Sequence, residues 1–237
     1  MRVLELWRYP VKSLLGERLE SVRVTENGFE GDRRFAIYDL ETGFGLTARR
    51  VPELLFASAR LRDDGSAEIT LPDGSTARSD DELSDWLGRR VALRSSDSNV
   101  TRLYENPEDF EHDSDWQPFK GADGPFHDSA RARVSLVSSA TIRDWDPRRF
   151  RSNVFLDGAG EDDLVGSEVL LGDARLNVGK QIDRCVMITR PQAGGIERDL
   201  DVLRTVARER GNNLAVGALV AHPGEVRVGD ELTTATG

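Results

Sequence analysis

Short segments in which hydrophobic and polar residues alternate occur along much of this chain. Alternation with a period of two is typical of a half-buried strand, and it occurs at residues 19–25, 67–71 and 225–228. Residues 34–38 (RFAIY) form a short apolar run that indicates a buried strand, and residues 170–178 predict a hairpin around a Gly-Asp turn. We therefore expect a chain dominated by strands.

Helical spacing is limited to three short segments. Residues 79–88 open with a capping box at Ser79 and end at Gly88, and residues 199–210 place their apolar side chains on one face. Residues 138–145 suggest a third, shorter helix. Many short strands with scattered helices favour β-barrel or sandwich-like units over a doubly wound sheet, so the predicted fold is mainly β with a few helices (α+β).

An acidic, proline-containing stretch marks the best candidate for a domain boundary. Residues 105–115 contain six acids and neither Lys nor Arg. We expect an N-terminal β-barrel-like domain at 1–104, an acidic linker at 105–125, and a second β-barrel domain at 126–237.

Composition and charge exclude several classes of protein. The net charge of −10 argues against nucleic-acid binding, which needs a basic face. No run of about 18 apolar residues predicts a membrane span, and the first residues lack a secretory pattern, so we expect a cytoplasmic protein. Basic spots around Lys12, Arg33 and residues 148–151 could nevertheless hold one compact anionic ligand. The alternative is a solvated surface with random charge patches.

Common catalytic motifs are absent from the sequence. The histidines His112, His127 and His222 have no metal-ligand spacing, and there is no G-x-S-x-G, Walker or Rossmann pattern. Cys185 is the only cysteine, so it forms no disulfide within the chain. It could be a nucleophile beside His127, but no pattern brings the two together. From the residues alone, packing and soft metal ligation are the two leading interpretations of this thiol.

Three short motifs offer groups that suit a phosphate or a heterocycle. YPVKS (9–13) presents Lys12 and Ser13 after a proline, although an exposed turn would read the same way. Arg33 and Arg34 open the predicted buried strand, where the alternative is a surface salt bridge. Arg151 and Asn153 lie two residues apart and so share one face of a strand. Asn has both donor and acceptor groups for a heterocycle edge.

Together these motifs resemble the family of MOSC proteins, and the resemblance covers nearly the whole chain. The N-terminal part matches in order at YPVKS, GDRRF and LTARRVPEL, and the later part at FHDSARARVSLVSSATI, RFRSNVFLDG, GDARLNV, RCVMIT and HPGEVRVGDEL. The resemblance implies an N-terminal MOSC β-barrel domain followed by a MOSC domain. Members of this family include mitochondrial amidoxime-reducing components and bacterial hydroxylaminopurine-resistance proteins.

The resemblance also implies a molybdenum cofactor (Mo-molybdopterin) and assigns its ligands. Cys185 would be the catalytic residue that ligates molybdenum, which suits a soft thiolate. The implied cofactor-binding residues are Lys12, Ser13, Arg33, Ser138, Ser139, Arg151 and Asn153. Residues 190–195 depart from the family's Thr-x-Asp-Pro-x-Thr-Gly pattern close to the expected substrate mouth.

The implied function is reduction of a small-molecule substrate, an N-hydroxylated or N-oxide compound. Because the 237 residues contain one cysteine, we expect no fused ferredoxin domain. We therefore expect a separate electron donor of ferredoxin type, flavin reductase type or cytochrome type. The alternative is a non-catalytic carrier of molybdenum cofactor or sulfur.

Overall fold

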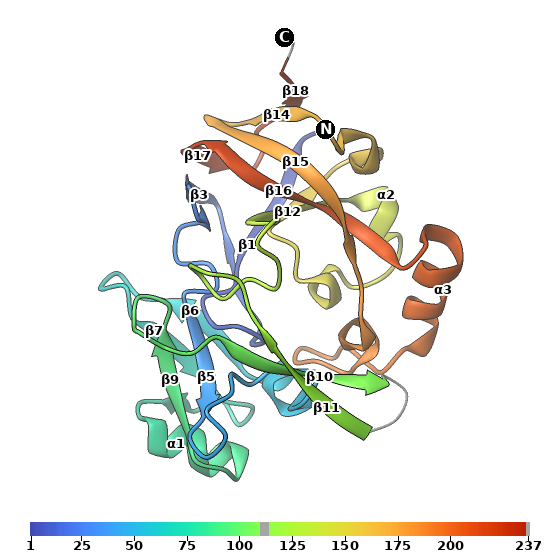
Figure 1. Ribbon diagram of the computed structural model, residues 1–237. Helices are drawn as coiled ribbons and strands as arrows, with labels where there is room; N and C mark the ends of the chain where they lie inside the picture. Colours follow the sequence, from blue (N-terminus) through green and yellow to red (C-terminus); the bar gives the residue numbers. More distant parts are fainter. Residues whose placement is uncertain (110–113, 236–237) are drawn as a thin grey trace.

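The computed structural model describes residues 1–109 and 114–235, and strands dominate it as predicted (Figure 1). Its largest element is a curled eight-stranded sheet. In spatial order, its strands are β18 (Leu232–Thr234), β14 (Glu168–Leu171), β15 (Ala174–Asp183), β16 (Asn213–His222), β12 (Val134–Ser138), β13 (Val154–Leu156), β1 (Val3–Arg8) and β2 (Glu17–Leu19).

Four smaller sheets complete the β-structure. They are β17 (Gly224–Arg227) with β3 (Ser21–Thr25) and β4 (Gly28–Phe29); β5 (Phe35–Asp39) with β9 (Val91–Ser95); β6 (Ser58–Leu61) with β7 (Ala67–Thr70) and β8 (Thr76–Ala77); and β10 (Leu103–Asp109) with β11 (Ser114–Lys120). The segment expected as a linker thus contains β11 and part of β10, which pair as an antiparallel hairpin.

The helices are short, and their ends follow the capping signals in the sequence. They are α1 (Asp80–Leu87), α2 (Ser139–Ile142) and α3 (Leu200–Arg210), with 3₁₀ turns η1 (Pro52–Phe56), η2 (Pro147–Phe150), η3 (Glu161–Leu164) and η4 (Val186–Thr189). The Ser79 hydroxyl accepts a hydrogen bond from the Glu82 amide at 3.2 Å, and Gly88 ends α1 with φ 62°. The predicted helix at 138–145 is confirmed only over four residues. No described helix has the length and apolar character needed to cross a membrane.

Strands from the two ends of the chain are interleaved. β1 pairs with β13, and β3 pairs with β17, so residues before the predicted boundary share sheets with residues after it. After β1, the chain leaves the core of the large sheet, which contains Leu6, and enters a second core, which contains Val11 and Leu14. Residues 9–15 therefore lie at the junction of the two cores, and this places the YPVKS motif there.

Candidate functional site

Lys12 and Ser13 lie at that junction and are both buried. The Lys12 ammonium donates hydrogen bonds to Asp128 Oδ1 at 2.5 Å and to the Phe126 carbonyl oxygen at 3.1 Å. It also lies 5.0 Å from the centre of the Tyr104 ring, a cation–π contact. Ser13 Oγ accepts a hydrogen bond from the Ala48 amide at 3.1 Å, so the hydroxyl hydrogen is not used in this bond.

Arg33 and Arg151 both pack over Tyr9. Their guanidinium carbons lie 4.8 and 4.6 Å from the centre of the Tyr9 ring. Arg33 Nη1 donates to Asp32 Oδ2, and Arg33 Nη2 donates to the Arg151 carbonyl oxygen at 3.1 Å. Arg151 Nη1 is buried without a partner among the described residues. Burial lowers the pKa of Arg151 to about 10, because desolvation penalises its charged form.

The Asn153 side chain is fully hydrogen-bonded within the protein. Its Oδ1 accepts from the Ser135 amide at 3.1 Å and from Ser135 Oγ at 3.0 Å. Its Nδ2 donates to the Trp7 carbonyl oxygen at 3.2 Å and to Asp32 Oδ2 at 3.1 Å. Asn153 therefore positions Asp32, which in turn holds Arg33, and its contact with a pterin stays a prediction.

Cys185 is half-buried and lies between β15 and η4. The preceding residue, Arg184, donates from Nε to the Leu214 carbonyl oxygen at 2.7 Å and from Nη1 to the Phe150 carbonyl oxygen at 2.9 Å. Its Nη2 is buried without a partner among the described residues. Burial lowers the pKa of Arg184 to about 10, although the neighbouring Cys185 partly opposes this effect.

Two arginines that sequence reasoning did not single out also act on Cys185. Burial alone would lower the pKa of Arg49. The attraction and hydrogen bond of Cys185, together with the charges of Asp128 and Asp183, outweigh burial, and the net effect is a raised pKa. Burial lowers the pKa of Arg190, with Cys185 opposing the shift. Arg49 lies in the LTARRVPEL motif, and Arg190 lies in the segment that departs from the family pattern. These two positions are the features of the sequence that could have indicated a role for the two arginines.

Asp128 marks a point where cations converge. Its side chain is 84% exposed, yet it pairs with the buried Lys12. The surroundings raise its pKa through desolvation, but Lys12, Arg33 and Arg49 together hold the pKa well below its usual range. Arg151 is also subject to the Asp128 charge. The Asp128 carboxylate thus pairs with Lys12 and is attracted by three further cations, an environment that favours an anion.

We call Lys12, Arg33, Arg49, Arg151 and Arg184 the basic cluster. Its members come from five separated segments of the chain, and Arg49 interacts with both Asp128 and Cys185. The structure therefore brings together Cys185 and the predicted residues Lys12, Arg33 and Arg151, with Ser13 next to Lys12.

Left-handed backbone conformations concentrate around this cluster. Among the described residues other than glycine, positive φ angles occur at Ser13, Arg33, Arg143, Arg151, Asn212 and Ala215. Of these, Ser13, Arg33 and Arg151 are predicted site residues. Asn212 hydrogen-bonds Arg184 through both its backbone and its side chain. Strained backbone of this kind typically clusters at functional sites.

Ser138 and Ser139 lie at the other end of β12 from Asn153. Ser138 pairs with Leu156, whereas Asn153 hydrogen-bonds Ser135, about 10 Å away along the strand. Ser138 Oγ donates to Glu161 Oε2 at 2.5 Å, and Ser139 Oγ donates to the Gly158 carbonyl oxygen at 3.4 Å. The structure gives neither serine a hydrogen bond to the basic cluster, and their role toward a cofactor stays a prediction.

The described histidines lie apart from Cys185. His127 is buried, and its Nε2 lies 3.3 Å from the Asn27 carbonyl oxygen, while His222 is exposed. His112 lies outside the described residues. The charges acting on His127 are those of Asp32, Arg33 and Arg133, so the structure does not support a Cys185–His127 pair.

His127 predicts a loss of stability in acid. Burial lowers its pKa to about 4 in the folded protein, below the ordinary value of about 6.5, so the unfolded chain binds the proton more tightly. Its contribution is therefore complete above about pH 6.5 and declines by roughly 3 kcal/mol as the pH falls to 4. Urea unfolding between pH 7 and pH 4 measures this dependence.

His127→Gln should flatten the same pH dependence, whereas His222→Gln, at an exposed position, should leave it unchanged. An identical pH dependence in wild type and His127→Gln would show that His127 is not the group responsible.

Comparisons with known proteins agree with the whole-chain resemblance. The family model described as the MOSC N-terminal beta barrel domain matches residues 1–101, and the model of the MOSC domain matches residues 119–233. A molybdenum cofactor sulfurase of Drosophila grimshawi is 26% identical across 98% of this chain and 33% of its own length. Mitochondrial amidoxime reducing component 2 of Bos taurus is 24% identical across 83% of this chain and 68% of its own length. The chain thus spans about a third of the sulfurase.

Proposed function

This chain belongs to the MOSC family, and on that premise we propose that it is a molybdenum-cofactor-dependent reductase of N-hydroxylated or N-oxide compounds. One observation carries the proposal: a half-buried thiol and a cluster of cations lie together, linked through Arg49. The amidoxime reducing component among its relatives supports the same class of reaction.

The residues present fit a cofactor that combines an anionic phosphate with a soft-metal centre. Arg151 Nη1 and Arg184 Nη2 are buried donors without partners in the described chain, a condition that costs about 1–3 kcal/mol each until an acceptor arrives. Lys12 and Arg33 add cations, and Cys185 offers a thiolate. No group of three or more His, Cys, Asp or Glu among the described residues could hold a metal, so the other ligands of a metal at Cys185 would come from the cofactor.

The residues of the site divide three tasks in the proposed mechanism. Lys12, Arg33 and Arg151 would hold the phosphate end, Arg184 would orient the pterin, and Cys185 would ligate molybdenum. When bound, the cofactor supplies a two-electron couple between Mo(VI) and Mo(IV).

The overall reaction is balanced with an external reductant. The N–O bond breaks, two electrons and two protons enter, and water leaves together with the N–H compound from an N-hydroxylated substrate or the free amine from an N-oxide. A separate electron carrier of ferredoxin, flavin reductase or cytochrome type would deliver the electrons.

Lys12 would exchange partners when the cofactor binds. Its ammonium is now paired with the Asp128 carboxylate at 2.5 Å, and Asp128 is exposed enough to turn toward solvent. A phosphate has more charge than a carboxylate and can accept from several donors at once, so it would replace Asp128 among the cations.

A second candidate function is that of a non-catalytic carrier of molybdenum cofactor or sulfur. The observation that favours it is the match to a molybdenum cofactor sulfurase. That match covers 98% of this chain but only 33% of the sulfurase, so this chain corresponds to one part of a larger cofactor-handling protein. Such a module would need the same basic cluster to bind the cofactor but no substrate site.

Metal content and turnover together separate the two functions. The protein is purified from a host that makes molybdenum cofactor, its molybdenum is measured per chain, and benzamidoxime reduction is assayed with a chemical reductant. Bound molybdenum with turnover supports the reductase, and bound molybdenum without turnover supports the carrier. Absence of molybdenum after expression in such a host would overturn both.

A further inference from the structure

The segment after η4, residues 190–195, is held firmly beside Cys185. Arg149 Nη1 donates to the carbonyl oxygens of Ile188 at 3.2 Å and of Arg190 at 3.3 Å, and Arg148 Nη2 donates to the Gly194 carbonyl oxygen at 3.1 Å. The Ala193 amide donates to the Leu55 carbonyl oxygen at 3.1 Å, which ties the segment to the second core. The backbone of this segment is therefore held in place relative to Cys185 before any ligand binds.

Arg190 is the charged side chain of this segment, and it retains an unused donor. Its Nη2 donates to the Arg49 carbonyl oxygen at 3.2 Å, while its Nε is buried without a partner among the described residues. The charges that act on Arg190 are those of Cys185, Glu53 and Arg198, whereas Asp128 acts on the cations expected to hold the phosphate. Arg190 thus belongs to the surroundings of Cys185 and not to those of Asp128.

From these contacts we infer that the substrate has a carboxylate, which Arg190 binds beside Cys185. This inference rests on the proposed reductase function and specifies its substrate class as an N-oxygenated carboxylic acid. The half-buried guanidinium of Arg190 would turn its unpartnered Nε toward the carboxylate, whose charge is attracted by both Arg190 and Arg49. Because this contact is distant from the breaking N–O bond, it lowers KM more than it raises kcat.

Two probes of equal size test the charge requirement. 4-Carboxybenzamidoxime has the carboxylate, and 4-carbamoylbenzamidoxime replaces it with a neutral amide of nearly the same shape. With molybdenum-loaded protein and a chemical reductant, the ratio of their kcat/KM values should favour the carboxylate by about tenfold to a hundredfold, as for one hydrogen bond to a charged group. The equilibrium dissociation constants without reductant should differ in the same direction.

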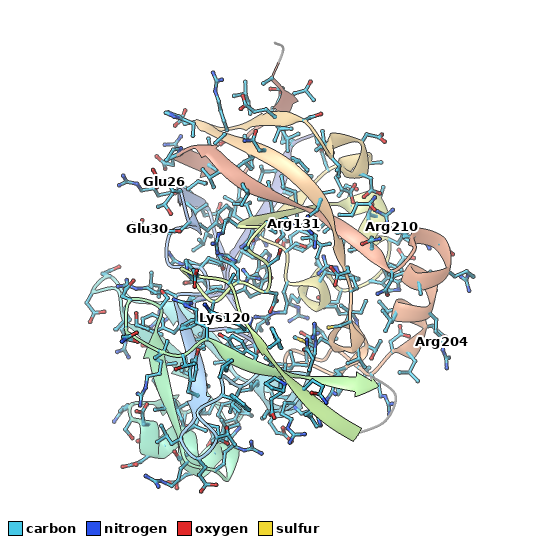
Figure 2. The ribbon with its side chains drawn as sticks, in the orientation of Figure 1. Glu26, Glu30, Lys120, Arg131, Arg204 and Arg210 are labelled. Carbon is cyan, nitrogen blue, oxygen red and sulfur yellow. The ribbon has the colours of Figure 1, made fainter. Side chains whose placement is uncertain are left out.

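Variants at Arg190 should remove this preference. Arg190→Gln should bring the ratio close to one and Arg190→Glu should reverse it, while Arg190→Lys should keep part of it. Arg204→Gln is the matched control, because Arg204 lies on α3 at the right-hand margin of Figure 2 with its side chain 70% exposed. Thermal unfolding shows whether each variant is folded. If Arg190→Gln does not fold, the carboxylate preference of Arg190→Lys tests the inference in its place.

The outcomes distinguish this inference from the proposed function. Turnover of both probes without a preference, or with a preference that Arg190→Gln leaves intact, overturns the inference and leaves the reductase standing. If molybdenum-loaded protein reduces neither probe, the reductase fails. The dissociation constants then decide, because carboxylate binding that depends on Arg190 supports the anion site, and its absence overturns it.

Discussion

Cys185→Ser should remove molybdenum from the purified protein and lower reductase turnover by more than about a hundredfold. Even groups that only orient a metal ligand contribute about tenfold to a hundredfold, and Cys185 would be the ligand itself. The fold should survive, because Cys185 is half-buried and its side chain caps no helix. A serine also keeps a polar group that can hydrogen-bond Arg49.

Molybdenum per chain, turnover and the midpoint of thermal unfolding are the three measurements for this variant. The midpoint should shift by no more than about 4 °C, corresponding to about 1 kcal/mol in a chain of this size. Cys185→Ala serves as a second variant that has no polar group at all. Wild-type molybdenum content in both variants would exclude Cys185 as the ligand. Unfolded variants together with a metal-free wild type would show that the thiol is a packing residue.

The second large effect is on folding stability, at Asp32. Its carboxylate is buried, accepts from the Tyr9 amide at 2.7 Å and from Asn153 Nδ2 at 3.1 Å, and pairs with Arg33 Nη1. Asp32→Ala removes the ion-pair partner of Arg33 and leaves the Tyr9 amide and one N–H of Asn153 Nδ2 without an acceptor. We expect the free energy of unfolding to fall by about 3–5 kcal/mol, as for removal of one partner of a buried ion pair.

The neighbouring residue provides a matched control for Asp32. Arg34 pairs with Asp97 at 3.0 Å, but there both side chains are largely exposed. Asp97→Ala removes the same kind of ion pair and should cost no more than about 1 kcal/mol. Urea unfolding of the two variants measures both losses at once. Equal losses would mean that burial of the Asp32–Arg33 pair does not matter.

Local chemistry allowed the helix ends and the hairpin turn to be predicted. Ser79 and Gly88 cap α1 as their residue types require, and Gly211 ends α3 with φ 56°. The hairpin of β14 and β15 turns at Gly172-Asp173 as predicted. In each case the groups that decide the conformation lie within a few residues of one another, so a single stretch of sequence contains the information.

The pairing of distant strands could not be predicted in the same way. Leu6 of β1 lies opposite Val154 of β13, and Val22 of β3 lies opposite Val226 of β17. The alternation in each strand indicates a buried face but does not identify the partner strand. The sequence indicates a linker at 105–125 for a related reason, because many acids and the prolines Pro107 and Pro118 obscure the alternation of β10 and β11.

The candidate site was predicted in part. Lys12, Arg33, Arg151 and Cys185 came from motifs. In the structure Lys12 and Arg33 act on Asp128, Arg33 hydrogen-bonds Arg151, and Arg33 and Cys185 both act on Arg184. Arg49 and Asp128 were missed, because their importance depends on charges contributed by other segments and not on their neighbours in sequence. The amide groups of Asn153 pair with Ser135, Trp7 and Asp32, and its predicted contact with a cofactor stays a prediction.

The place of β1 in the large sheet has a consequence for the order of folding during synthesis. β1 is made about 150 residues before its partner β13, and β3 waits even longer for β17. β1 and β3 can each pair at once on one edge with the next strand, β2 or β4, but at about 5–20 residues per second their other edges stay unpaired for some ten seconds or more. Closing such long loops is slow, so we expect these two edges to be the part of the nascent chain most exposed to wrong pairing.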